Sequence, residues 1–404
     1  MGYMINYDET KIPTYTLPDP LTDLSGRPVR DAAAWVLRRR PELLRLFEQH
    51  VYGRIPDADI PMGVGGTLDT AALNGLATRK EVTLTFGMAE TPPQIHLLLY
   101  VPNAATGRVP AFLGLNFFGN HTIHPDPGIT LGTVWTPVEE GSKVLAPRPA
   151  KDTERGLAAS RWPVERILKR GYALATAYCG DSDPDFDDSF HNGVHALLPR
   201  DDAAGDAWAT FGAWAWSLSR IMDYFEMDPH VDERRVAVLG HSRLGKAAVW
   251  AGAADERFAL VISNNSGCGG AALSRRRIGE TVRAINERFP HWFCTNFKQY
   301  NDHEDALPVD QHMLLALIAP RPLYVASAEE DRWSDPRGEF LGALHANPVY
   351  RLFGVEGLPV DEMPDLERPV MGKIAYHIRT GKHDVTAYDW EQYLNFADRH
   401  WGHS

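Results

Sequence analysis

The sequence predicts an α/β fold, a three-layer sandwich whose mostly parallel central sheet is preceded by N-terminal antiparallel strands. Short apolar runs, typical of buried parallel strands, alternate with helical segments over residues 172–400. Upstream, strand candidates at 80–86, 95–101 and 109–116 follow one another with no helix between them, which favours antiparallel pairing. A strand, a tight turn and a helix over 235–250 complete the pattern.

The other elements follow in chain order. Residues 1–35 are rich in proline and aspartate and should cover the surface, and 32–53 favours a helix that is interrupted near Pro41. Residues 122–160 carry many prolines and glycines without a clear period, so a long loop is expected there. Further helices are predicted at 162–170, 206–226 and 388–400, and further buried strands at 172–178, 258–263, 321–328 and 373–377.

The composition is that of an ordinary globular chain. The 404 residues are 44% hydrophobic and contain no internal repeat or low-complexity linker, which predicts a single domain over 1–404 with an N-terminal extension and loop insertions. A net charge of −12 argues against nucleic acid and anionic membranes as partners, because both attract basic surfaces. No stretch of the sequence is long and apolar enough to span a bilayer.

Cysteines and histidines give little support for a metal site. Cys179, Cys268 and Cys294 form no C-x-x-C pair, which disfavours zinc or redox chemistry, and pairing of Cys268 with Cys294 stays open. His121 and His124 share no acidic or cysteine partner at helical spacing. We therefore expect them to be surface histidines and expect no metal.

The strand, turn and helix over 235–250 have the sequence RVAVLGHSRLGKAAVW. An apolar strand ends in a turn with Ser242 at its apex, and small apolar residues continue as a helix. Such a turn forces the serine into a strained backbone conformation and presents its hydroxyl at the top of the sheet. Gly240 and Gly245 lack a Cβ, which lets the strand and the helix approach closely. This arrangement is typical of the nucleophile of an α/β-hydrolase.

Two other interpretations of this turn exist. G-x-x-x-x-G-K is also the start of a phosphate-binding loop, although Ala247 stands where that loop needs serine or threonine to bind Mg²⁺. The turn can also be a strand–helix connection without chemistry. The rest of the chain favours the hydrolase, because a phosphate loop leaves His383 and the acidic cluster before it unexplained.

Candidate partners for Ser242 follow in the order of α/β-hydrolases, which is Ser…Asp/Glu…His. An acidic cluster, Glu329, Glu330 and Asp331, follows one predicted strand, and His383 follows the last one. A serine hydroxyl attacks only when an imidazole takes its proton, and the imidazole needs a carboxylate to orient it. His383 is one of 16 histidines, so its place in this order is what makes it a candidate.

Two segments are candidates for stabilising an oxyanion. Arg243 directly follows the serine, so its backbone N–H and its guanidinium suit the oxyanion hole, and the alternative for this residue is a surface ion pair. Gly119 and Asn120, after the third strand candidate, are equally consistent with an oxyanion amide and with a plain turn.

The motif GHSRLGKAA resembles the nucleophile turn G-C/H-S-R-x-G-K of the glucuronoyl esterases, carbohydrate esterase family 15. The likeness extends to LNFFGNH, the AWAW helix, SGCGGAALSRR, DRWSDP and GKHD, and so covers most of the chain from about residue 80. It implies an α/β-hydrolase that cleaves the ester between glucuronic acid on xylan and lignin alcohols, without a metal or a cofactor.

Individual residues take their expected roles from this resemblance. Ser242 is similar to the family's nucleophile, His383 to its base and Arg243 to its oxyanion-stabilising residue. A polar group beside an aromatic platform suits a sugar acid. The residues that match the family's glucuronate-binding groups are Lys246, Glu280 and Trp333.

One position departs from the fungal members, which carry the triad acid as a glutamate in the loop after the strand that follows the nucleophile. Asn265 occupies that position here and cannot be an anion. The resemblance to bacterial members implies that the acid has moved to Asp331, after the next strand. The fungal disulfide that brackets serine and histidine is also absent, because His241 and Asp384 occupy its positions.

We therefore expect a secreted or periplasmic serine esterase whose substrate is a glucuronoxylan or lignin–carbohydrate ester of (4-O-methyl-)glucuronic acid. It should be a monomer without a cofactor, its signal peptide being absent from this sequence. One alternative is an acetyl- or feruloyl-type carbohydrate esterase, which does not need Lys246, Glu280 and Trp333 together. The other is a catalytically weak carbohydrate-binding homologue, which the asparagine at 265 leaves open. In each case the domain over 1–404 is an α/β-hydrolase domain.

Overall fold

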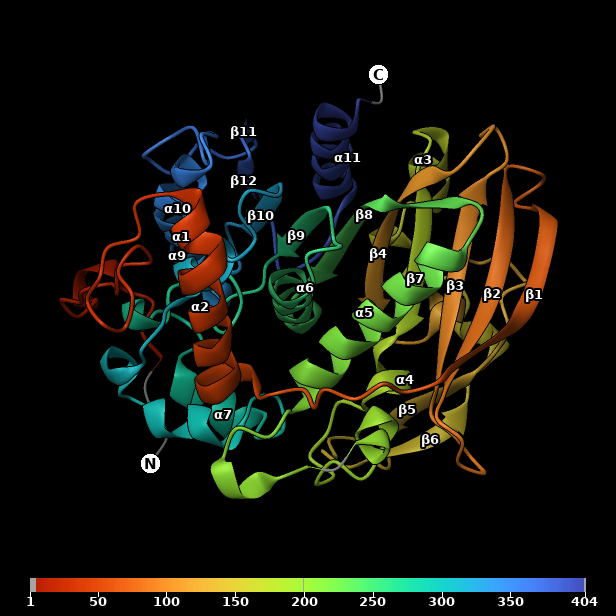
Figure 1. Ribbon diagram of the computed structural model, residues 1–404. Helices are drawn as coiled ribbons and strands as arrows, with labels where there is room; N and C mark the ends of the chain where they lie inside the picture. The colour runs from red at the N-terminus through yellow and green to blue at the C-terminus, as the bar shows by residue number, and fades with distance from the viewer. Residues whose placement is uncertain (1–4, 199, 403–404) are drawn as a thin grey trace. The chain divides into compact units, whose positions relative to one another are not determined.

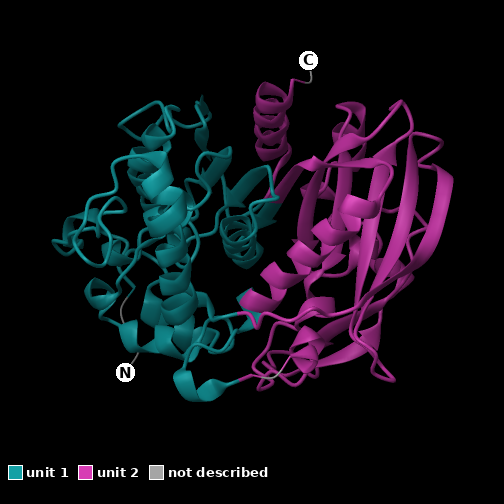
Figure 2. Cartoon of the chain, in the orientation of Figure 1, with its two compact units in different colours: residues 1–54, 201–211, 239–384 teal, residues 55–200, 212–238, 385–404 magenta. Residues whose placement is uncertain are grey.

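The computed structural model describes residues 5–198 and 200–402 (Figure 1). The chain forms two compact units, each assembled from three segments (Figure 2). Unit 1 consists of residues 1–54, 201–211 and 239–384, and unit 2 consists of residues 55–200, 212–238 and 385–404.

Unit 2 holds the antiparallel strands. Its strands are β1 (Met62–Ala72), β2 (Ala77–Phe86), β3 (Gln94–Pro102), β4 (Val109–Asn116), β7 (Ala173–Tyr178) and the first part of β8 (Val231–His241). β1, β2, β3 and β7 pair antiparallel in this order, and β4 pairs parallel with β7. The prediction of one antiparallel run is therefore wrong for the strand at 109–116, because β7 lies between β3 and β4. Every residue of β4 and β7 is buried, as expected for apolar strands with a neighbour on each side.

The segment 122–160 contains a hairpin of two antiparallel strands, β5 (Thr133–Pro137) and β6 (Leu145–Pro149), so the prediction of a long loop is wrong for these residues. Most hairpin residues are partly or fully exposed, and no apolar period marks them. Strand β1 was not predicted either, because it is rich in glycine, is largely exposed and has no apolar period.

Among the residues that the structure describes, four α-helices belong wholly or mainly to unit 2. They are α3 (Val164–Lys169), α4 (Cys179–Ser182), α5 (Thr210–Met227) and α11 (Ala387–Trp401). Trp214 and Phe225 of α5 are fully buried, so the aromatic side chains of this helix contribute to the core.

Unit 1 holds the strands that follow the serine turn. They are β9 (Leu260–Asn264), β10 (Leu323–Ala328), β11 (Val370–Met371) and β12 (Ile374–Arg379). β10 pairs parallel with both β9 and β12, and β11 pairs antiparallel with β12. The helices of this unit are α1 (Ala32–Ala34), α2 (Arg40–Phe47), α6 (Arg243–Ala254), α7 (Val282–Arg288), α8 (Gln311–Ala316), α9 (Pro336–His345) and α10 (Asn347–Leu352).

The helix predicted at 32–53 continues through Pro41. A π-helical turn, Trp35–Arg39, joins α1 to α2, and Pro41 lies in the first turn of α2. A proline ring clashes with the carbonyl four residues earlier in a regular helix, and the wider π-helical turn leaves room for it. The expected interruption is thus a local widening of one helix.

Within unit 2 the strand order is β1-β2-β3-β7-β4, and within unit 1 it is β9-β10-β12-β11 (Figure 1). The predicted α/β class, mostly parallel after an antiparallel start, is confirmed. The last residues of β8, 239–241, belong to unit 1 and lead directly into the serine turn. All three cysteines are free and buried, so Cys268 and Cys294 do not pair.

His121 is 1% exposed, so the prediction that it is a surface histidine is wrong. Its Nε2 lies 3.6 Å from a carboxylate oxygen of Glu154, and burial lowers its pKa. His124 is partly buried and its Nε2 lies 3.0 Å from a carboxylate oxygen of Glu165. Over residues 5–198 and 200–402, no three histidine, cysteine, aspartate or glutamate side chains gather as a metal would require. Within the same residues, no helix combines the length and apolar character needed to cross a membrane.

Candidate active site

Ser242 occupies a strained backbone conformation between β8 and α6. Its φ and ψ are 57° and −129°, in a region that L-residues rarely adopt. Its N–H donates to the carbonyl oxygen of Asn264 over 2.9 Å, and α6 starts at the next residue. A Cβ at Gly240 would lie 2.0 Å from the carbonyl oxygen of Leu244, so only glycine fits where strand and helix meet. The turn has the geometry predicted from the motif.

Asp331 and His383 form a short hydrogen bond. Nδ1 of His383 lies 2.6 Å from Oδ2 of Asp331. A carboxylate only accepts hydrogen bonds, so Nδ1 carries the hydrogen and Nε2 is left as a base. More than a third of the His383 side chain is exposed, whereas Asp331 is 5% exposed. Glu329 and Glu330, the other acids of the cluster, are exposed.

The surroundings of Asp331 favour its ionised form. Burial alone raises the pKa of a carboxyl, but the hydrogen bond and charge of His383 and the hydrogen bonds from Ser334 and Asn265 lower the pKa of Asp331 below its ordinary value. Nδ2 of Asn265 donates to Oδ2 of Asp331 over 2.9 Å. Asn265 therefore contacts the Asp331 carboxylate directly.

One cavity of unit 1, with a volume of about 290 Å³, is lined by all seven residues to which the family resemblance gave a catalytic or substrate-binding role. Its lining combines the serine, the histidine and the carboxylate with two basic groups, an acid and an indole. These residues are Ser242, His383, Asp331, Arg243, Lys246, Glu280 and Trp333.

Lys246 and Glu280 form a buried ion pair in this cavity. Nζ of Lys246 lies 3.1 Å from Oε2 of Glu280 and donates to the carbonyl oxygen of Ser266 over 2.7 Å. The Glu280 N–H donates to the carbonyl oxygen of Trp333, which ties the acid to the half-buried indole. A buried ammonium paired in this way does not point outward toward a phosphate, which counts against the phosphate-loop interpretation.

Aromatic rings beside the serine support Arg243. The rings of Phe289 and Trp292 are stacked, with centroids 3.7 Å apart and planes inclined by 5°. The guanidinium carbon of Arg243 lies 5.0 Å from the Trp292 centroid and 5.5 Å from the Phe289 centroid, within cation–π range. Arg288 lies 4.9 Å from the centroid of Trp333. The sequence missed three lining residues because they lie at the end of α7 and directly after it, in a stretch that matches no motif. These residues are Arg288, Phe289 and Trp292.

The loop after β4 uses its polar groups internally. The Gly119 N–H donates to Oδ1 of Asn116 over 2.8 Å, and Nδ2 of Asn120 donates to the carbonyl oxygen of His96 over 2.8 Å. Of the two possibilities for this segment, these bonds favour the plain turn.

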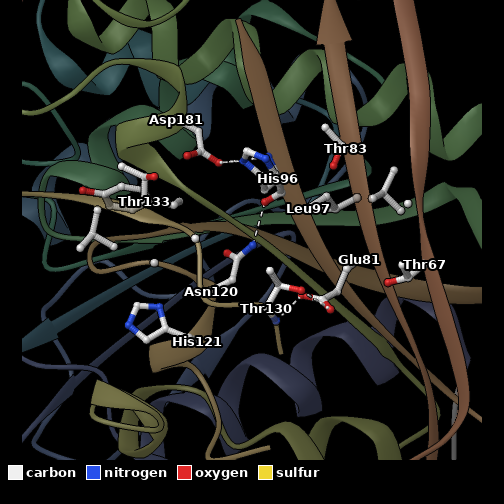
Figure 3. A pocket seen from close by; sticks show the side chains of 16 residues that line it. Thr67, Glu81, Thr83, His96, Leu97, Asn120, His121, Thr130, Thr133 and Asp181 are labelled. Carbon is white, nitrogen blue, oxygen red and sulfur yellow. Dashed lines mark hydrogen bonds and ion pairs between the residues drawn. The ribbon is translucent and has the colours of Figure 1, made fainter. Parts of the chain in front are cut away.

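Unit 2 has a cavity of its own, with a volume of about 180 Å³ (Figure 3). His96 pairs with Asp181, and the Glu81 carboxylate accepts from the backbone and hydroxyl of Thr130. Its sixteen lining residues include no serine or cysteine, whereas the cavity of unit 1 is lined by Ser242.

Comparison with known proteins identifies the family. A family model described as fungal glucuronyl esterase matches residues 199–354. The chain is 52% identical over 399 residues to carbohydrate esterase MZ0003 from an unknown prokaryotic organism, with 98% of this chain and 92% of that protein covered. The chain belongs to carbohydrate esterase family 15, the glucuronoyl esterases. The predicted family is confirmed, and with it the class of carboxylic ester hydrolases.

Two further members place this esterase within the family. It is 30% identical over 352 residues to a 4-O-methyl-glucuronoyl methylesterase of Phanerochaete carnosa, with 84% of this chain and 72% of that protein covered. A solved glucuronoyl esterase from Solibacter usitatus is 50% identical and superposes with a TM-score of 0.91, over 97% of this chain and all of that one. The identities to the prokaryotic relative and to the Solibacter structure are higher than the identity to the Phanerochaete enzyme.

Proposed function

We propose that this esterase hydrolyses esters of glucuronic acid or its 4-O-methyl ether, with Ser242 as nucleophile, His383 as general base and Asp331 as the triad acid. The observation that carries the proposal is the shared cavity: the serine, the Asp331–His383 pair and the Lys246–Glu280 pair all line it. A nucleophile, its base and two charged groups able to bind sugar hydroxyls thus line the same cavity.

The first half of the reaction forms an acyl-enzyme. Nε2 of His383 takes the hydroxyl proton as Oγ of Ser242 attacks the ester carbonyl carbon. Asp331 holds the imidazole in this tautomer and stabilises the imidazolium. The tetrahedral intermediate then expels the alcohol, whose oxygen receives the proton from His383. In the second half, water gives a proton to His383 and attacks the acyl carbon, and Ser242 leaves with the proton restored.

Arg243 is suited to stabilise the oxyanion of this intermediate. Its N–H lies at the start of α6, and its guanidinium faces the cavity with its position supported by Phe289 and Trp292. Removing one preorganised oxyanion donor typically costs about 3–4 kcal/mol of barrier stabilisation.

Lys246, Glu280 and Trp333 supply the recognition of the sugar. The ammonium donates to hydroxyl oxygens, the carboxylate accepts from hydroxyl groups, and the indole covers a ring face. Relatives named 4-O-methyl-glucuronoyl methylesterase support this substrate. We extend the proposal to glucuronoxylan and lignin–carbohydrate esters as natural substrates, to a secreted or periplasmic location, and to one monomeric catalytic domain over 1–404.

Two esters measured side by side test the function. Wild type should prefer benzyl glucuronate to p-nitrophenyl acetate, and Lys246→Met should lower kcat/KM for benzyl glucuronate by about 10- to 100-fold, the usual cost of a charged hydrogen bond. Its kcat/KM for the acetate should change little. Preference for the acetate with no effect of Lys246→Met would favour an acetyl-type esterase, and oligosaccharide binding without turnover would indicate a binding protein.

A further inference from the structure

The end of β9 and the loop that follows it, together residues 263–267, touch three parts of the active site at once. The carbonyl oxygen of Asn264 accepts from the backbone N–H of Ser242 over 2.9 Å. The side chain of Asn265 donates to Asp331 over 2.9 Å, and the carbonyl oxygen of Ser266 accepts from the ammonium of Lys246 over 2.7 Å. The position of this loop therefore affects the nucleophile, the triad acid and the sugar-binding lysine together.

Glu339 of α9 binds this loop from the interior. Its Oε1 accepts from the Gly267 N–H over 2.9 Å, and the hydroxyl of Ser266 lies 3.5 Å from the same oxygen. Its Oε2 accepts from the hydroxyl of Ser327, on β10, over 2.6 Å. Glu339 thereby connects the loop to the neighbouring strand, and it is fully buried.

Burying the carboxyl group of Glu339 in the core costs free energy, because a buried carboxylate without an ion-pair partner is strongly disfavoured. In the described part of the chain no lysine, arginine or histidine forms an ion pair with it. Burial raises the pKa of Glu339 to about 8, the nearby charge of Asp331 acting in the same direction. An apolar side chain would fill this place at lower cost, so the carboxyl is there for its hydrogen bonds.

We propose that Glu339 is a positioning residue, whose carboxyl holds the loop 263–267 so that Ser266 retains Lys246 and Asn265 retains Asp331. This inference rests on the proposed function for the sugar-binding role of Lys246. Without the carboxyl, the buried Gly267 N–H and Ser327 hydroxyl lose their partner, and the loop must move to satisfy them. Such a movement would disturb Lys246 through Ser266 and Asp331 through Asn265.

The variants Glu339→Gln and Glu339→Met separate the hydrogen bonds from the volume. The glutamine amide oxygen can still accept from Gly267 and its NH₂ can donate to Ser327, whereas methionine fills the space without these bonds. Glu339→Gln should keep kcat and KM within about threefold of wild type. Glu339→Met should raise KM for benzyl glucuronate about tenfold and lower kcat about tenfold. Glu362→Met, a change at an exposed glutamate, serves as the control.

The second ester gives the readout that a general loss of structure would not produce. p-Nitrophenyl acetate is too small to need Lys246, so in Glu339→Met its KM should stay constant while its kcat falls by the same factor as for benzyl glucuronate. Unchanged kinetics in Glu339→Met, or equal losses in the glutamine and methionine variants, would overturn the proposal. If the methionine variant does not fold, Glu339→Asp, which shortens the arm by one methylene, should show the same split in KM.

Failure of the proposed function is recognised separately. Wild-type turnover of benzyl glucuronate reports on the function before any variant is considered. If wild type cleaves only p-nitrophenyl acetate, kcat for that ester in Glu339→Met still tests the connection from Glu339 through Asn265 to Asp331. A kcat equal to that of wild type would contradict this connection.

Discussion

Asp331 is distinguished from its two acidic neighbours by its surroundings. It is buried and accepts from His383 and from Asn265, while Glu329 and Glu330 are exposed. A carboxylate orients an imidazole only if it is itself held in place, and burial with two donors provides this. The amide of Asn265 thus helps to hold the carboxylate that we propose as the triad acid.

Asp331→Asn should lower kcat for benzyl glucuronate by about 10³- to 10⁴-fold, because an amide no longer fixes the reactive tautomer of His383 or stabilises its charge. The fold should persist, since the two side chains have nearly the same shape. Steady-state assays measure kcat, and a thermal unfolding scan measures whether the fold persists. Glu330→Gln is the matched control, and a wild-type rate in Asp331→Asn would move the acid to Glu329 or Glu330.

At the scale of elements, the junction of β8 with α6 depends on glycine. A Cβ at position 240 would lie 2.0 Å from the Leu244 carbonyl, and one at position 245 would lie 3.0 Å from the Gly240 carbonyl and 3.1 Å from Ser266. The close approach keeps Ser242 at φ 57° and brings α6 against the loop 263–267. The strained backbone of Ser242 is therefore maintained by the packing of the end of β8 on the start of α6.

Gly240→Ala should lower the free energy of unfolding by about 1–3 kcal/mol, the usual cost of overpacking, and should reduce kcat through displacement of the serine turn. Chemical denaturation and benzyl glucuronate turnover measure the two effects. Gly107→Ala is the control, because a Cβ there meets nothing within 4 Å. Equal stability of the two variants would show that the junction is looser than the structure indicates.

For the whole molecule, Glu339 links the active-site loop to the pH dependence of stability. Its pKa is raised from the ordinary 4.5 to about 8, mainly by burial. Between these values the folded chain keeps a proton that the unfolded chain releases, so the unfolded state binds fewer protons and stability falls as pH rises. The contribution is complete below about pH 4.5 and is lost as pH approaches 8.

Glu339→Gln cannot ionise, so its free energy of unfolding should fall less than that of wild type between pH 5 and pH 8. Urea denaturation of both proteins at several pH values measures the difference. Relative to wild type, the glutamine variant should gain stability as pH rises across this window. A constant difference over the whole window would mean that Glu339 does not titrate between its folded and unfolded states.

The sequence by itself determined the elements and residues whose signals are local. The strand–turn–helix around Ser242, most strands and helices, the chain order of serine, acid and histidine, and the family are all visible in short motifs and periods. The sequence did not reveal β1 or the β5–β6 hairpin, because their exposed residues show no apolar period. It also did not reveal the strand pairing, since β7 lies between β3 and β4.

Only the tertiary structure decided which side chains meet. Asp331 and His383 lie 52 positions apart, Asn265 and Asp331 66, and Gly267 and Glu339 72, yet each pair is hydrogen-bonded. A single sequence records which groups are polar, but burial and hydrogen-bond partners follow from how distant segments pack. For that reason the burial and the hydrogen bonds that distinguish Asp331 from its two acidic neighbours, and the role of a glutamate inside α9, emerged only from the folded chain.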